Sequence, residues 1–257
     1  MTAQLETLRC SDAGAVRLVE LHRPQALNAF SNQLMDELAE TFLDAAHDPQ
    51  AKVLVVTGAG RAFSAGADLM EMGTQQTPPK HGFAGLLDAI FDFPKPFIVA
   101  VNGVGVGIGA TICGLADLAY MAEDARLRCP FSTLGLSAEA ASTFTFPQLM
   151  GRQRANWFLL SAEWMSASEC LDAGLVLEVL PAEGLMPRAM EQAQKLAALP
   201  LASLVKTKSL IMGPLRAQLR ASAAAENAGL AALVGGPANR EALTAFREKR
   251  QPNFAGL

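Results

Sequence analysis

The amino-acid sequence predicts an α/β fold in which most strands run parallel. Apolar strand-like runs alternate with stretches of helical spacing, and the runs are apolar on both faces, which is typical of strands buried inside a parallel sheet. After Glu183 the pattern becomes wholly helical. Because the 257 residues are 51% hydrophobic, they hold one substantial core, and we expect one domain with an appended helical piece.

The predicted elements begin with a hairpin. Alternating residues over 4–9 and 16–22 flank a turn-like segment at 11–14. Helical spacing then runs from Ser31, an expected N-cap, to about His47. The further predictions, in chain order, are strand 52–57, helix 83–93, strand 97–101, strands 117–122 and 176–180, and helical stretches from 183 to 197, 204–212, 215–233 and 238–249.

Composition and charge argue against several classes of protein. A formal net charge of -4 gives no basic face for nucleic acid. The four cysteines form no CxxC pair and the histidines lie far from them, so we expect reduced core thiols and neither disulfides nor a metal site. Residues 97–116 carry no charge, but their glycines favour a strand, a loop and a helix over a membrane span. With no targeting pattern at either end, the chain is expected to be cytoplasmic.

Two glycine-containing loops, 58–68 and 102–110, each follow a predicted buried strand. A loop that leaves a strand and enters a helix points backbone N–H groups outward, where the helix dipole also favours negative charge. Two such ends facing each other can hold one oxygen anion. Other interpretations stay open, because Gly105-x-Gly107-x-x-Ala110 also fits a dinucleotide-binding fingerprint, and the glycines also fit simple close packing.

Five short motifs stand in a recognisable order. They are Arg23-Pro24 with Asn28-Ala29, then Ala62-Phe63-Ser64-Ala65-Gly66-Ala67-Asp68, then Lys95-Pro96 leading to Ala100-Val101-Asn102-Gly103, then Ala173-Gly174-Leu175-Val176, and a C-terminal run from Phe246 to Phe254. In this order and spacing the sequence resembles the crotonase (enoyl-CoA hydratase/isomerase) superfamily over nearly its whole length. The resemblance implies a spiral core of ββα units over residues 1–200, a helical trimerisation region over 201–257, and a homotrimer or dimer of trimers.

The resemblance also implies how an acyl-CoA substrate binds. In that superfamily the thioester oxygen lies between two backbone amides, which by position here belong to Ala67 and Ile108. Removing a proton beside a thioester carbonyl places charge on this oxygen, and each fixed donor contributes about 3 kcal/mol. The residues expected to contact coenzyme A are Ala65, Ala67, Asp68, Leu69, Phe246 and Lys249. Coenzyme A is part of the substrate, so no separate cofactor is expected.

The acid/base residues decide among the reactions of the superfamily. Hydratases carry two glutamates, and their places are taken here by Thr111 and Phe131, which cannot transfer protons at neutral pH. Residues 130–147 resemble instead the delta-3,delta-2-enoyl-CoA isomerase branch, in which the residue matching Glu139 is the base. The resemblance therefore implies isomerisation of a 3-enoyl-CoA to a 2-trans-enoyl-CoA, with a single carboxyl carrying both proton transfers.

Alternatives to the isomerase function remain open. The protein could catalyse a hydratase-like or other crotonase reaction, or it could be a non-catalytic module that binds acyl-CoA or a protein, as the related chromodomain Y-like proteins are thought to do. Those proteins carry aspartate where Glu139 stands, and the glutamate favours catalysis. Taken without the resemblance, Glu139 also fits a solvated acid in the first turn of a helix, where the dipole favours it.

Overall fold

The computed structural model describes residues 5–69, 71 and 78–257. Its larger sheet has the strand order β1-β2-β3-β5-β7-β10 and is parallel except for the antiparallel pair β1 and β2. The strands are β1 Leu8–Ala13, β2 Val16–Leu21, β3 Val53–Gly58, β5 Phe97–Val101, β7 Leu118–Ala122 and β10 Glu178–Leu180. Every residue of β3 and β5 is buried, as expected for central parallel strands. The predicted α/β class is confirmed.

A second sheet, with the order β4-β6-β8-β9, was not predicted. Its strands are β4 Ala62–Ser64, β6 Val104–Val106, β8 Arg126–Arg128 and β9 Trp164–Ser166. The first three run parallel to one another, and β9 closes the sheet antiparallel to β8. Strands of three residues are too short to show a period, which is why the sequence pattern missed them. They interrupt both glycine-containing loops, so neither loop runs directly from its buried strand into a helix.

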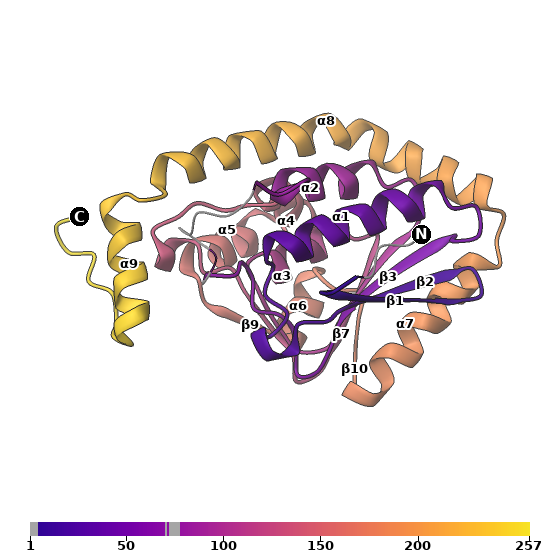
Figure 1. The fold of residues 1–257 in the computed structure, drawn as a ribbon, viewed down its shortest axis with the longest axis horizontal. Helices are drawn as coiled ribbons and strands as arrows, with labels where there is room; N and C mark the ends of the chain where they lie inside the picture. Colours follow the sequence, from indigo (N-terminus) through magenta and orange to yellow (C-terminus); the bar gives the residue numbers. More distant parts are fainter. Residues whose placement is uncertain (1–4, 70, 72–77) are drawn as a thin grey trace.

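Helices cover both faces of the larger sheet. On one face lie α1 Asn32–His47 and α2 Gly82–Asp92, and on the other lies α7 Ala182–Ala197 (Figure 1). The side chain of Ser31 caps α1 by accepting a hydrogen bond from the Leu34 amide, as predicted. Phe42 on α1 packs edge-on against Phe97 of β5, with ring centroids 4.9 Å apart. The core is therefore continuous from these helices into the sheet.

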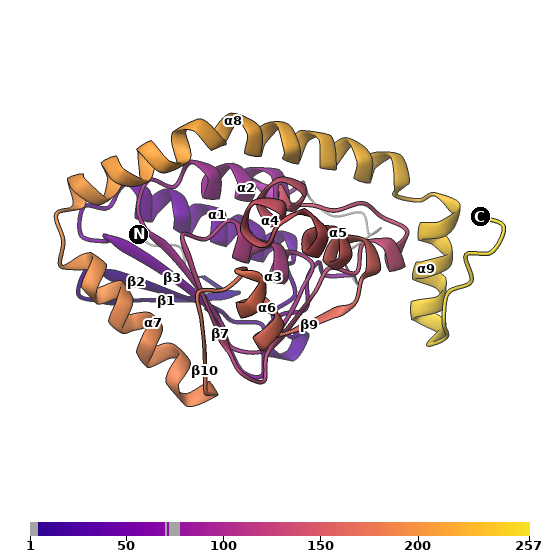
Figure 2. The same ribbon diagram turned by 180° about the vertical axis from the view of Figure 1, so that it is seen from behind.

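The remaining helices lie toward the second sheet and the C-terminus. They are α3 Ile108–Thr111, α4 Ser142–Met150, α5 Arg152–Ser161, α6 Ala167–Ala173, α8 Leu201–Leu233 and α9 Pro237–Glu248, with 3-10 turns η1 Pro24–Ala26, η2 Ile112–Gly114 and η3 Ser132–Leu134. The long helix α8 runs over α1, α2 and α4, and α9 turns away from it at the far end (Figures 1 and 2). A bend of 104° separates α7 from α8.

The structure corrects three details of the prediction. The first strand is β1, which ends at Ala13 opposite Val16, so positions 11–13 lie in the strand and the turn is at Gly14. Part of the predicted strand, residue 4, lies outside the described residues. The tail forms one helix, α8, where two stretches were predicted. Cys10 is exposed on β1, whereas the other three cysteines are buried.

None of the described helices is by itself long and apolar enough to span a membrane, although the bent pair of α7 and α8 passes a test of length and composition together. Residues 97–116 form β5, β6, α3 and η2, so the predicted strand, loop and helix are confirmed with one further strand between them.

Candidate active site

The two glycine-containing loops meet at the carboxyl ends of neighbouring parallel strands. Strand β4 pairs with β6, and a glycine with positive φ follows each strand within two residues, Gly66 at 87° and Gly107 at 54°. A Cβ on Gly66 would lie 2.8 Å from the carbonyl oxygen of Val106, and one on Gly107 would lie 3.8 Å from the Cα of Gly66. Only glycine allows this approach. The residues after them, Ala67 and Ile108, therefore lie on adjoining loops.

The backbone amides of Ala67 and Ile108 are placed to donate outward. Phe30 pairs with Ala67 in a parallel bridge that uses the carbonyl of Gly66 and the amide of Asp68. In parallel pairing the amide between those two groups points away from the partner strand. Ile108 is the first residue of α3, where a helical amide has no acceptor within its own helix. The geometry thus brings the two predicted oxyanion donors together.

The first loop is held by the Arg23-Pro24 and Asn28-Ala29 motif. The buried side chain of Asn28 donates hydrogen bonds of 2.9 and 2.8 Å to the carbonyl oxygens of Ala59 and Ala62, both in the first half of the loop. The guanidinium of Arg23 forms an ion pair of 2.9 Å with Asp68. This motif therefore holds the loop that carries the Ala67 amide.

The Glu139 carboxyl lies against the Gly107–Ile108 peptide. Its Oε1 atom is 3.3 Å from the point that a Cβ on Gly107 would occupy, and the Ile108 amide donates a hydrogen bond to the carboxyl. Glu139 precedes α4 by three positions and its carbonyl accepts from the Ser142 amide. The interpretation of Glu139 as a solvated acid in a first helical turn is therefore wrong, because it lies in the loop before the helix.

The surroundings of Glu139 favour its neutral form. Burial of the carboxyl raises its pKa from 4.5 to about 7, the negative charge of Glu226 adds to the rise, and the Ile108 amide opposes it. The residue as a whole keeps partial exposure, but protein atoms surround its carboxyl closely, and that local environment determines the pKa. A carboxyl that titrates near pH 7 is suited to accept and return a proton.

Glu226 belongs to the surroundings of Glu139 but was not predicted from the sequence. It is the one acidic residue of α8, an otherwise Ala-rich and basic stretch, and that isolation was the available signal. Thr111 and Phe131, which take the positions of the hydratase glutamates, are both buried, and neither supplies a carboxylate.

The residues predicted to contact coenzyme A lie in two separate places. Ala65, Asp68 and Leu69 are partly exposed and Ala67 is exposed, so the first loop borders solvent beside the paired amides. Phe246 is 60% exposed on α9, which packs against η3, and Lys249 caps that helix with a left-handed backbone.

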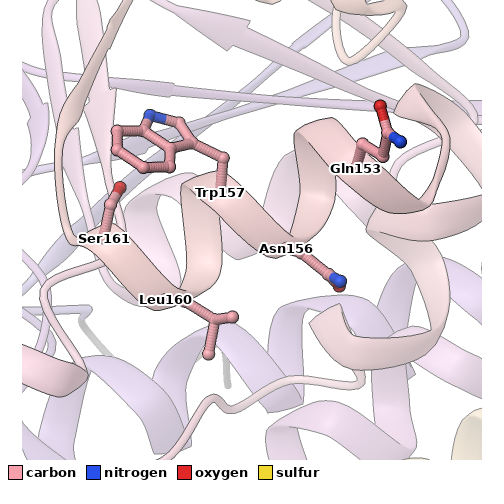
Figure 3. Close-up of a pocket in the computed structure, with 5 residues that line it drawn as sticks. All are labelled: Gln153, Asn156, Trp157, Leu160 and Ser161. Carbon is pink, nitrogen blue, oxygen red and sulfur yellow. The ribbon is translucent and has the colours of Figure 1, made fainter.

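Two other features do not form part of this site. Figure 3 shows a surface hollow lined by Gln153, Asn156, Trp157, Leu160 and Ser161, all from α5, and it includes none of the residues named above. Over residues 5–69, 71 and 78–257, no group of three or more His, Cys, Asp and Glu side chains is arranged to hold a metal ion.

The dinucleotide-binding interpretation of the second loop does not fit the sheet. Gly105 packs closely against the carbonyl of Gly109 in α3, and the strand order of the larger sheet never reverses, so the described sheet lacks the crevice of a dinucleotide-binding fold.

Comparisons with known proteins agree with this arrangement. The family profile described as enoyl-CoA hydratase/isomerase matches residues 11–256. A 2,3-dehydroadipyl-CoA hydratase of Escherichia coli is 33% identical over 248 residues, which cover 94% of this chain and 95% of that protein. Human enoyl-CoA delta isomerase 2 is 32% identical over 86% of this chain, which spans only 58% of that protein's length.

Solved structures extend the likeness to the fold. An enoyl-CoA hydratase/isomerase from Pseudoalteromonas atlantica superposes with a TM-score of 0.93 at 32% identity, covering 97% of this chain and all of the other. An enoyl-CoA hydratase from Mycobacterium marinum is 50% identical, with a TM-score of 0.78 over 81% of this chain and 100% of the other. These relatives carry both hydratase and isomerase names, so the names do not select a reaction.

Proposed function

The chain belongs to the enoyl-CoA hydratase/isomerase family, and from this premise we propose that it shifts the double bond of a 3-enoyl-CoA to give the 2-trans-enoyl-CoA. One observation carries the choice of reaction. Glu139 is the carboxyl that lies against the Gly107–Ile108 peptide, and the two positions at which hydratases hold glutamates carry Thr111 and Phe131. A site with one proton-transfer group fits a reaction that takes a proton from one carbon and returns it to another.

Binding of the thioester uses the two loops. The carbonyl oxygen of the substrate accepts hydrogen bonds from the amides of Ala67 and Ile108, which lie on adjoining loops held by Gly66 and Gly107. Without substrate the Ile108 amide donates to the Glu139 carboxyl, so the thioester oxygen takes over this donor when it binds. The pantetheine and nucleotide extend past Ala65, Asp68 and Leu69, and Phe246 and Lys249 approach the nucleotide from α9. Lys249 supplies a cation for phosphate.

The proton then moves through Glu139 alone. The carboxylate accepts a proton from C2, and the electron pair of that C–H bond passes into the C1–C2 bond while the thioester carbonyl becomes an enolate oxygen held by the two amides. The thioester carbonyl then re-forms and the C1–C2 electron pair becomes the C2–C3 double bond. The electron pair of the C3–C4 double bond takes the proton of the Glu139 carboxylic acid at C4. No atoms are gained or lost, and the C3–C4 double bond has become a C2–C3 double bond.

The raised pKa of Glu139 supports this role. A base with a pKa of about 7 is largely ionised just above neutrality and still strong enough to attack a carbon acid, and its conjugate acid returns the proton readily. The two amides stabilise the negative charge that appears on the thioester oxygen, with about 3 kcal/mol from each donor. Because several relatives carry hydratase names, the rate of isomerisation should be compared with the rate of hydration of a 2-enoyl-CoA.

The decisive experiment replaces Glu139 by glutamine, which preserves size but cannot accept the proton. Turnover of 3-hexenoyl-CoA should fall by at least about 100-fold while binding of the thioester persists. A matched control is Glu163→Gln, since Glu163 is an exposed acid away from the site and should leave turnover unchanged. In deuterated water, protium retained at C4 would report direct return of the C2 proton by Glu139, and deuterium at C4 would report exchange of the Glu139 proton with solvent before its return.

Three outcomes would contradict the proposal. An active Glu139→Gln protein would remove Glu139 from the chemistry. Faster hydration of a 2-enoyl-CoA than isomerisation by the wild type would make the protein a hydratase. Binding of thioester without any turnover would make it a binding module.

A further inference from the structure

The segment that carries Glu139 is tied to the C-terminal helix by one buried carboxylate. Glu226 on α8 is 6% exposed and accepts hydrogen bonds from the Ala141 amide at 2.6 Å and from the Thr143 amide at 2.8 Å. The hydroxyl of Thr143 donates to the same carboxylate at 2.6 Å. Glu226 thus occupies the start of α4, where helical amides lack acceptors and the dipole favours an anion. Its bonds reach the backbone two positions after Glu139.

The backbone between Glu139 and α4 adopts an uncommon conformation. Ala140 and Ala141 have φ angles of 59° and 54°, the left-handed region that residues with a Cβ rarely adopt. Two such alanines in succession persist only where neighbouring structure holds them. The bond from the Ala141 amide to Glu226 is the contact from outside the segment that fixes this turn. Both alanines are buried.

We propose that Glu226 is a positioning residue of the active site, which holds the strained turn at Ala140 and Ala141 and thereby aims the Glu139 carboxyl at the Gly107–Ile108 peptide. The inference rests on the proposed function in that Glu139 is the base. Without the clamp, the turn would relax toward ordinary backbone angles and the Glu139 side chain would leave its contact with Gly107. Displacements of about 1 Å in a reacting group cost up to about 100-fold in rate.

The same carboxylate also acts on Glu139 through its charge. Among the described residues, two titratable groups face Glu139: Glu226 from α8, and the Cys129 thiol from the end of β8. Burial raises the pKa of Cys129 well above its usual range, so this thiol stays uncharged near neutrality. Glu226 is therefore the charged neighbour of Glu139, and it raises the pKa of Glu139. Removing its charge should make Glu139 a weaker base that ionises at lower pH.

Three variants separate these effects. Glu226→Gln removes the charge and one acceptor, Glu226→Asp keeps the charge but shortens the reach to Ala141, and Ser222→Ala removes a hydroxyl that lies 2.8 Å from the Thr143 hydroxyl on the same face of α8. Each is measured for kcat and KM with 3-hexenoyl-CoA across pH. Infrared titration of the Glu139 carboxyl, assigned by its absence in Glu139→Gln, reports its ionisation without turnover.

Glu226→Gln should lower kcat by about 10- to 100-fold with KM changed by less than about threefold, and should move the acidic limb of the pH profile and the infrared titration to lower pH. Glu226→Asp should lower kcat but leave the acidic limb of the pH profile at its original pH, and Ser222→Ala should resemble the wild type. The aspartate variant decides the positioning role if the glutamine variant does not fold.

The proposal is overturned if Glu226→Asp or a folded Glu226→Gln keeps wild-type kcat, or if the Glu139 titration stays at its original pH in Glu226→Gln. A wild type that fails to isomerise would refute the proposed function instead. The infrared titration would still show whether Glu226 acts on Glu139.

Discussion

Replacing Glu139 by glutamine should stabilise the protein above pH 7 even as it abolishes the proposed chemistry. The folded state holds the Glu139 proton between pH 4.5 and about 7, where the unfolded chain has released it. Since the folded state binds more protons in this window, the free energy of unfolding falls as the pH rises through it. The pKa of Glu139 differs by about 2.5 between the unfolded and folded states, which lowers the free energy of unfolding by roughly 3 kcal/mol at about 1.4 kcal/mol per pKa unit. Glutamine is neutral at every pH and escapes this loss.

The measurement is thermal unfolding of the wild type and Glu139→Gln at about pH 5 and about pH 8.5. The melting temperature of the variant minus that of the wild type should be about 6 °C larger at pH 8.5 than at pH 5. This follows from about 2 °C per kcal/mol for a chain of this size. Glu123→Gln, at an exposed acid, should show no such change. A difference between variant and wild type that is the same at both pH values would refute the raised pKa of Glu139.

The remaining predictions concern the loop, the nucleotide and assembly. Gly107→Ala should lower kcat by about 10- to 100-fold, because its Cβ would press on the Glu139 carboxyl, whereas Gly151→Ala, with a φ of 74° and open space around it, should cost stability only. Lys249→Ala should weaken acyl-CoA binding and reduce its salt dependence, and calorimetry showing unchanged affinity at both salt concentrations would remove Lys249 from the site. Light scattering should give a mass that is a multiple of three chains, and a monomer at micromolar concentration would contradict assembly through the tail.

The long elements with a clear period could be predicted from the sequence. The five consecutive apolar residues of β5 and the Ser31 cap of α1 appear in the structure where the pattern placed them. The two predicted pieces of the tail are 204–212 and 215–233, and Pro214 between them removes a helical hydrogen bond. The helix α8 continues through it because both halves are fixed to the core, by Lys208 with Asp117 on one side and by the buried Leu219 on the other. Those contacts join residues far apart in the chain, which local patterns cannot show.

The candidate site was predicted unevenly for a related reason. The meeting of the two glycine loops was expected, because each follows a buried strand of what had to be one parallel sheet. The short strands β4 and β6 that bring Gly66 and Gly107 together left no periodic signal. The role of Glu139 came from the resemblance of residues 130–147, but the charge of Glu226 beside it could not be predicted, since 87 positions separate residue 139 from residue 226.

Helix α8 joins the two parts of the molecule that the sequence treated as separate regions. One face carries Leu219, Ala223 and Glu226, which pack on the core and hold the turn before α4. Nearer the start of the helix, Leu210 and Ile211 are 67% and 61% exposed, on the tail through which assembly is predicted. Leu210, Ile211 and Glu226 belong to one continuous helix, so a change in how the exposed part of α8 is covered is expected to reach Glu226 as well. The position and basicity of Glu139 should therefore respond to assembly, and kcat should depend on protein concentration wherever the oligomer dissociates.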